Sequence, residues 1–84
     1  MALTDDFESA QQRINTLSAP PSQAELLELY GLFKQATLGD ATGKRPGMLD
    51  IKGRAKFDAW SARKGMSQDD AMSAYVALVD RLVG

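Results

Sequence analysis

A proline pair followed directly by a helix-start signal constrains the fold of this chain more than any other feature. Pro20 and Pro21 are predicted to end the helix that precedes them, because proline lacks the backbone N–H and its ring clashes with the preceding helical turn. Residues 22–25, Ser-Gln-Ala-Glu, then have the spacing of a capping box, in which two side chains satisfy free backbone N–H groups. This short stretch predicts the end of one helix and the start of the next.

Apolar residues recur at helical spacing in four segments of the sequence. Each segment begins with a residue whose side chain can cap a helix: Thr4, Ser22, Asp50 and Ser67. The second and third segments are predicted to end near Thr37 and Lys64, where Gly39 and Gly65 follow as stop signals. The sequence contains no alternating run of β-branched residues, so no strand is predicted. The predicted fold class is therefore all-α, a four-helix bundle whose two short turns favour antiparallel pairing of helices one with two and three with four.

The connection between the second and third helices is unusually long. Residues 38–50 (LGDATGKRPGMLD) hold three glycines and one proline and support neither helix nor strand. Connections of roughly 2–8 residues are typical of bundles, and longer ones are usually functional or disordered. Met48 and Leu49 favour docking of this loop over disorder. Its length also permits a crossover rather than simple up-and-down winding.

The composition excludes several classes of function. The 84 residues include no cysteine and no histidine, which removes disulfides, thiolate metal sites, the commonest metal ligand and the usual general base near neutral pH. No apolar run approaches the roughly 20 residues that span a bilayer, and no basic-then-apolar leader opens the chain. We therefore expect one small soluble domain of an intracellular type over residues 1–84, a binding protein with no catalytic residue, no metal, no cofactor and no stable membrane insertion.

Charge is segregated along the chain although the formal net charge is only −1. Residues 1–30 carry five acids and one base, whereas residues 31–64 carry eight bases and three acids, a net of +5. A nucleic-acid-binding protein usually has an overall basic excess. A local cationic cluster on a nearly neutral body better suits a small, highly charged anion. The alternative is that these lysines and arginines only solvate exposed helix faces.

Two predicted helices place rings beside ammonium groups. Tyr30, Phe33 and Lys34 share one face of the second helix, while Lys52 and Lys56 share a face of the third. Lysines supply charge and hydrogen-bond donors for phosphate, and a flat ring offers a stacking surface for a base. The pattern therefore favours a nucleotide-like ligand, with burial of the rings in the core as the alternative.

Two further side chains are open to the same double interpretation. Arg45, in the long loop, could bring a guanidinium to a phosphate or could stand exposed in an ordinary turn. Tyr75 could donate its hydroxyl to a ligand or pack in the core with its oxygen at the surface.

Four stretches carry a resemblance to a known family. They are residues 30–40 (YGLFKQATLGD), 45–50 (RPGMLD), 52–60 (KGRAKFDAW) and 70–75 (DAMSAY). Together they resemble the acyl-CoA-binding proteins over essentially the whole chain. The resemblance implies a four-helix fold and a cytoplasmic monomer that carries medium- to long-chain fatty acyl-CoA esters without catalysis.

The resemblance also implies roles for individual side chains toward the head group. Tyr30, Lys34 and Lys56 match the residues that grip the ribose 3′-phosphate region, and Phe33 matches a ring near the adenine. Further contacts are implied for Lys52 and Tyr75. The family often has tyrosine at the position of Phe33. It also often has lysine where this chain has Asn15, so weaker head-group binding is expected at that corner.

A groove for the acyl tail is expected beside the head-group residues. The candidate lining residues are Leu26, Leu27, Leu29, Met48, Leu49 and Ala55. Two alternatives remain from other classes. A DNA-binding domain would place the third helix in a groove of the duplex, and a protein-interaction module would present exposed apolar residues to a partner.

Overall fold

The computed structural model describes residues 2–83, and helices account for all of its regular structure. The elements are α1 (Leu3–Arg13), the short 3₁₀ helix η1 (Ile14–Thr16), α2 (Gln23–Leu38), α3 (Ile51–Ser61) and α4 (Gln68–Val83). Residues 2–83 contain no strand, so the predicted all-α class and the four helices are confirmed.

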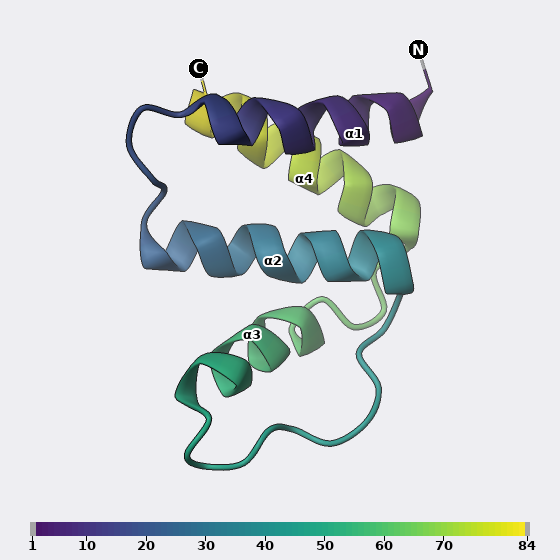
Figure 1. Cartoon of the computed structure of the whole chain (residues 1–84). Coiled ribbons are helices and arrows are strands. Elements are labelled where there is room, and N and C mark those ends of the chain that lie inside the picture. The colour runs from purple at the N-terminus through teal and green to yellow at the C-terminus, as the bar shows by residue number, and fades with distance from the viewer. Residues whose placement is uncertain (1, 84) are drawn as a thin grey trace.

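The helices do not pair in chain order. Helix α4 packs against both α1 and α2, and α3 packs against α2 alone. Figure 1 shows α1 and α4 at one end of the molecule, α3 and the long loop at the other, and α2 between them. The prediction that helices one and two, and three and four, form the packed pairs is therefore wrong. The physical reason is that the buried stripe of α4 is shared between α1 and α2, which leaves only α2 to cover α3.

Side-chain caps start three of the four helices. At α2, the Ser22 Oγ accepts a hydrogen bond from the Glu25 N–H at 3.2 Å, and Glu25 Oε1 accepts from the Ser22 N–H at 2.8 Å, which confirms the capping box. Asp50 caps α3 by accepting from the Gly53 N–H at 3.0 Å. At α4, the Ser67 Oγ accepts from the backbone N–H three residues on, at 3.0 Å.

Three predicted boundaries are wrong. The proline pair does not end the first helix, because α1 ends at Arg13 and the 3₁₀ helix η1 ends at Thr16, before Pro20 is reached. The first helix begins at Leu3, with Ala2 at the cap position and no side-chain cap, so Thr4 lies inside the helix and caps nothing. The third helix ends at Ser61 rather than near Lys64. Residues 62–65 form a turn, in which the Lys64 N–H bonds to the Ser61 carbonyl at the 3₁₀ spacing. The predicted stop of the second helix at Gly39 is confirmed, with φ of 81° at that glycine.

The apolar core lies between α1, α2 and α4. Its centre is a group of three rings: Tyr75 meets Phe7 edge-on at 5.1 Å between centroids, and Phe33 stacks on Phe7 at 6.0 Å. The other buried apolar residues are Ala10, Leu29, Leu32, Ala36, Ala71, Leu78 and Val79. Helix α3 contributes no buried residue to this core.

A glycine on α2 allows α3 to pack close to it, although α3 buries no side chain in the core. A Cβ placed on Gly31 would lie 2.5 Å from the Ala59 carbonyl oxygen. Real Cβ atoms do not approach backbone oxygen that closely, so the two helices can adopt this spacing only because residue 31 has no side chain. The close approach brings the neighbouring Tyr30 and Lys34 of α2 toward α3.

A polar junction joins the end of α2 to the α3–α4 turn. Gln35 is fully buried, and its amide nitrogen donates to Asp40 Oδ1 at 2.8 Å and to the Met66 carbonyl at 2.7 Å. The same Asp40 oxygen accepts from the Gly65 N–H at 2.9 Å. Nearby, the Trp60 indole N–H donates to the carbonyl that follows α2, at 2.8 Å. These bonds fix the C-terminal end of α3 relative to the end of α2.

The long loop is tethered by an ion pair, not by docked apolar residues. The Arg45 guanidinium forms a two-pronged contact with Asp58 of α3, with N–O distances of 2.9 and 2.6 Å. Arg45 therefore has a structural partner in place of the phosphate considered for it. Met48 and Leu49 are 81% and 100% exposed, so the prediction that they dock is wrong. The loop can hold its course without them because the charge-assisted pair anchors its middle.

Candidate ligand-binding site

Two lysines from different helices converge on one tyrosine ring. The Lys34 Nζ lies 5.7 Å from the Tyr30 ring centroid, and the Lys56 Nζ lies 5.5 Å from the same centroid. Lys34 Nζ is also 5.8 Å from the Trp60 ring. We call these four residues the Tyr30 cluster. The predicted meeting of Tyr30, Lys34 and Lys56 on one connected surface is confirmed.

Helix geometry explains how the Tyr30 cluster forms. Tyr30 and Lys34 are four residues apart on α2, and Lys56 and Trp60 are four apart on α3, so each pair occupies one helix face. The close packing at Gly31 then turns the two faces toward each other. Cation–π contacts at these distances are individually weak, but they hold the two ammonium groups beside the ring.

Both ammonium groups of the cluster keep their charge available for a ligand. Within residues 2–83, ion pairs join Arg13 to Asp80 and Arg45 to Asp58, and neither involves Lys34 or Lys56. An anionic group placed here would meet two positive charges that no protein carboxylate neutralises. The arrangement suits a phosphate more than any neutral ligand.

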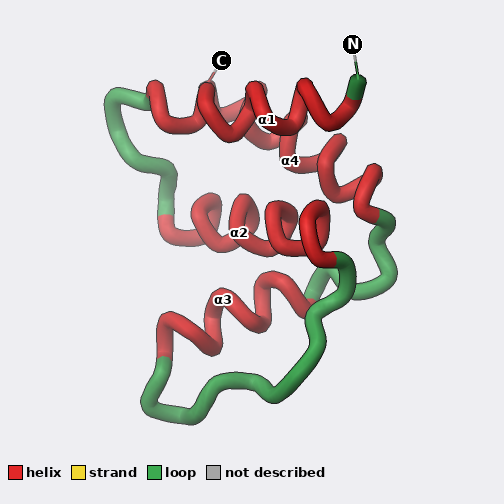
Figure 2. The backbone as a smooth tube through the Cα atoms, turned by 45° about the vertical axis from the view of Figure 1, so that its right-hand side comes forward, coloured by secondary structure: helices red, strands yellow, loops and turns green. Residues whose placement is uncertain are grey.

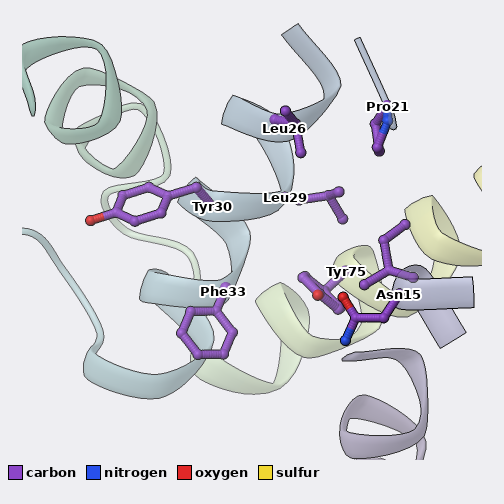
Figure 3. Close-up of a pocket in the computed structure, with 8 residues that line it drawn as sticks. Asn15, Pro21, Leu26, Leu29, Tyr30, Phe33 and Tyr75 are labelled. Carbon is purple, nitrogen blue, oxygen red and sulfur yellow. The ribbon is translucent and has the colours of Figure 1, made fainter. Parts of the chain in front are cut away.

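An apolar hollow of about 330 Å³ opens next to the Tyr30 cluster. It is lined by Ile14, Asn15, Pro21, Leu26, Leu29, Tyr30, Phe33 and Tyr75. Figure 3 shows Leu29 projecting from α2 on the side of Asn15, whereas the Tyr30 ring projects on the opposite side. Tyr30 is therefore common to both features: it is one of the residues that line the hollow, and its ring is the one that the two lysines approach.

Three of the predicted contact residues at the hollow differ in burial. Tyr75 is buried among the core rings, and burial raises the pKa of its hydroxyl, which keeps it protonated as a hydrogen-bond donor. Phe33 is half-buried against Phe7, and its ring also lines the hollow. Asn15 is exposed, and its amide donates to the Gln11 carbonyl at 3.2 Å.

The candidate tail residues do not form one continuous lining. Leu26 and Leu29 line the first hollow. Met48 and Ala55 line a second hollow of about 350 Å³, together with Arg45, Ile51, Arg54 and Asp58. Leu27 and Leu49 line neither of these hollows, and the same is true of Lys52, which is exposed on α3.

Sequence reasoning missed three residues that the structure brings to the site. Trp60 contacts Lys34 across the two helices, which the spacing within one helix does not predict. Ile14 and Pro21 line the first hollow, and neither was among the candidate site residues. The placement of Pro21 directly before the capping box, four residues ahead of Glu25, was the signal that put it near the start of α2.

Residues 2–83 hold no group of three or more acidic, histidine or cysteine side chains that could bind a metal ion. None of the helices described is both long enough and apolar enough to cross a membrane.

Comparison with known proteins assigns the family. Residues 4–79 match the family model for "Acyl CoA binding protein". The chain is 52% identical over 81 residues to acyl-CoA-binding protein homolog 1 of Caenorhabditis elegans, covering 96% of this chain and 94% of that protein. It is 51% identical over 83 residues to the acyl-CoA-binding protein of Brassica napus, covering 99% and 90%. This chain belongs to the acyl-CoA-binding protein family.

The solved structures agree with this assignment. The crystal structure of Oryza sativa acyl-CoA-binding protein 2 matches with a TM-score of 0.93 and 41% sequence identity, covering 98% of this chain and 91% of that one. The arrangement of α1 to α4 described above is therefore the fold of the family. The resemblance seen in the sequence is confirmed.

Proposed function

We propose that this protein binds medium- to long-chain fatty acyl-CoA esters and carries them in the cytoplasm as a single-domain monomer, without catalysis. The observation that carries the proposal is the Tyr30 cluster, where Lys34 and Lys56 lie 5.7 and 5.5 Å from one ring beside an apolar hollow. Family membership supports it, because the matched relatives are named acyl-CoA-binding proteins. No comparison supports the DNA-binding or protein-interaction alternatives.

The head group of coenzyme A matches the charged side of the site. It combines a 3′-phosphate and a diphosphate with an adenine, so it needs both cations and a flat ring. We assign the phosphates to Lys34 and Lys56, and the adenine to the rings of Tyr30 and Phe33. Lys52, Asn15 and Tyr75 are assigned as further contacts.

The acyl tail matches the apolar side of the site. Burial is worth roughly 0.8 kcal/mol per methylene, so about ten sequestered methylenes contribute about 8 kcal/mol before ordering costs. Leu26 and Leu29 already line a hollow next to Tyr30, and we assign Leu27, Met48, Leu49 and Ala55 to the same path. Affinity should therefore rise with chain length.

The protein has no evident means of breaking the thioester. The sequence contains neither histidine nor cysteine, so the usual base and the most reactive nucleophile are absent. We therefore assign the protein a shielding role, in which the ester is held away from water and needs no cofactor.

Titration calorimetry with palmitoyl-CoA and with free coenzyme A tests the proposal. Lys34→Ala with Lys56→Ala should weaken both ligands roughly 100-fold, because two charge-assisted contacts are lost. Lys44→Ala with Lys64→Ala is the matched control, since it removes the same charge from two exposed lysines outside the Tyr30 cluster. Equal affinity of the Lys34/Lys56 variant and the parent would show that the head group binds elsewhere.

A further inference from the structure

Trp60 is the member of the Tyr30 cluster to which the proposed function gives no ligand contact. Its ring comes from α3, and the ring centroid lies 5.8 Å from the Lys34 Nζ of α2. Its indole N–H donates to the Gly39 carbonyl at 2.8 Å. Both contacts are possible because the end of α2 lies beside the C-terminal end of α3, as Figure 2 shows. One side chain therefore joins a lysine of the site to the backbone that follows α2.

The hydrogen bond at Gly39 fixes the orientation of the indole. Gly39 ends α2 with a φ of 81°, and its own N–H donates to the Gln35 carbonyl at 3.1 Å. The carbonyl that accepts from Trp60 therefore belongs to a hydrogen-bonded helix cap. The indole has a single N–H and no acceptor, so this bond satisfies its polar group completely. The half-buried ring is thus held as a fixed surface beside Lys34.

The two lysines of the cluster are restrained to different degrees. Lys34 Nζ lies 5.7 Å from the Tyr30 ring and 5.8 Å from the Trp60 ring, and its side chain is half-buried. Among residues 2–83, Lys56 Nζ approaches the Tyr30 ring alone, at 5.5 Å, and its side chain is exposed. Two rings from two helices therefore restrain Lys34, whereas one ring restrains Lys56.

Restraint before binding favours affinity for an anion. A lysine side chain has several rotatable bonds, and it loses rotamer entropy when its ammonium is fixed on a phosphate. A ring that already holds the ammonium in place lowers the part of this cost that falls on binding. A cation–π contact also leaves the positive charge unneutralised, unlike a contact with a carboxylate.

We propose that Trp60 is a positioning residue, which holds the Lys34 ammonium where a phosphate of the ligand meets it and does not itself touch the ligand. The inference rests on the proposed function, because it assigns a role in the same site. Trp60 should then act on affinity through Lys34 and not through Lys56, although Lys56 lies on its own helix, one turn away. If Trp60 only held α3 in place, its loss would disturb Lys56 as well.

A double-mutant cycle with palmitoyl-CoA, measured by titration calorimetry, tests this role. Trp60→Leu should weaken binding about tenfold, because Lys34 loses the ring that restrains it. In a Lys34→Ala background the same change should weaken binding less than about twofold, since no ammonium remains to be positioned. In a Lys56→Ala background, the matched control, it should again weaken binding about tenfold. Trp60→Phe keeps a ring and should lose less affinity than Trp60→Leu.

Two results of the cycle would overturn the proposal. The first is the same effect of Trp60→Leu in both lysine backgrounds, which would show that Trp60 supports α3 as a whole. The second is an equal loss for Trp60→Phe and Trp60→Leu, because the loss would then come from the hydrogen bond to Gly39 and not from the ring at Lys34.

A nuclear Overhauser effect in the ligand-free parent tests the contact without any variant, so the proposal stays testable if Trp60→Leu unfolds. We expect a cross-peak between the ring protons of Trp60 and the ε-methylene protons of Lys34. Its absence would overturn the positioning role. Normal palmitoyl-CoA binding without the cross-peak would overturn this role alone, whereas a parent that does not bind palmitoyl-CoA would overturn the proposed function and the role with it.

Discussion

The two halves of this molecule are stabilised in different ways. Helices α1, α2 and α4 share a core in which Phe7, Phe33 and Tyr75 pack ring against ring. Helix α3 buries no residue, and it is attached to the α2 segment by the close approach at Gly31 and by the Trp60 hydrogen bond to the Gly39 carbonyl. The Arg45–Asp58 pair ties the long loop to α3. The core half also carries Tyr30, Lys34 and Phe33 of the candidate site, and α3 adds Lys56 to them. The core half therefore serves both stability and ligand recognition, whereas α3 completes the site and buries no residue in the core.

The largest expected difference between the halves is in the cost of removing a ring. Phe7→Ala should lower the free energy of unfolding by about 4 kcal/mol, because it leaves a cavity beside Phe33 and Tyr75. Phe57→Ala, on half-buried α3, should cost clearly less. Urea unfolding followed by circular dichroism measures both. Similar losses for the two variants would show that α3 belongs to the same core.

The next largest effect should come from the junction between the halves. Gly31→Ala should lower the free energy of unfolding by about 2 kcal/mol, because the new methyl group forces α2 and α3 apart. The same change should weaken palmitoyl-CoA binding by separating Lys56 from Tyr30. Gly47→Ala is the matched control, since a Cβ there meets nothing within 4 Å. Unchanged ligand affinity in the Gly31 variant would contradict the role given to this close approach.

The smallest expected effect concerns acid stability of the polar junction. The Gly65 N–H, followed by the Gln35 amide, lowers the pKa of Asp40 below its ordinary value. A lowered folded-state pKa means that the stabilisation is fully present above the unfolded-state pKa of about 3.9. It is lost as the pH falls through the folded-state value.

Thermal unfolding between neutral and acidic pH checks the contribution of Asp40. The parent midpoint should fall as the pH drops below about 4. Asp40→Asn should start from a lower midpoint at neutral pH and should lose less on acidification, because the titrating group is gone. An identical pH profile for the two proteins would show that the Asp40 contacts do not contribute to stability.

The features that could be predicted from the sequence are those decided within one helical turn. Ser22, Asp50 and Ser67 cap their helices because each side chain reaches an N–H three residues away, whatever the rest of the chain does. The i, i+4 spacing of Tyr30 and Lys34 fixed their common face in the same way.

The features that could not be predicted depend on partners far along the chain. Gln35 is polar and lies in the last turn of α2, yet it is fully buried because Asp40 and the Met66 carbonyl accept its hydrogen bonds. Helix α4 packs against both α1 and α2 because the apolar stripes of several helices compete to cover one another. The sequence of a single helix does not show which other helix its stripe will cover. Met48 and Leu49 were predicted to hold the long loop in place by docking. The contact that holds it is the Arg45–Asp58 pair, which joins residues 13 positions apart and so leaves no local signal in the sequence.

The candidate site was predictable only in part for the same reason. Spacing placed Tyr30 with Lys34, and Lys52 with Lys56, but could not join the two helices. The resemblance to the acyl-CoA-binding proteins joined them, and the close approach at Gly31 supplies the physical cause.

A crystal structure of this protein with palmitoyl-CoA bound would test the central claim most directly. We expect phosphate oxygens of the ligand within hydrogen-bonding distance of the Lys34 and Lys56 Nζ atoms, with the adenine against the ring of Tyr30 or Phe33. The alkyl chain should run along α2 from there. A head group bound on the α1–α4 face, with both lysines left in solvent, would contradict the account.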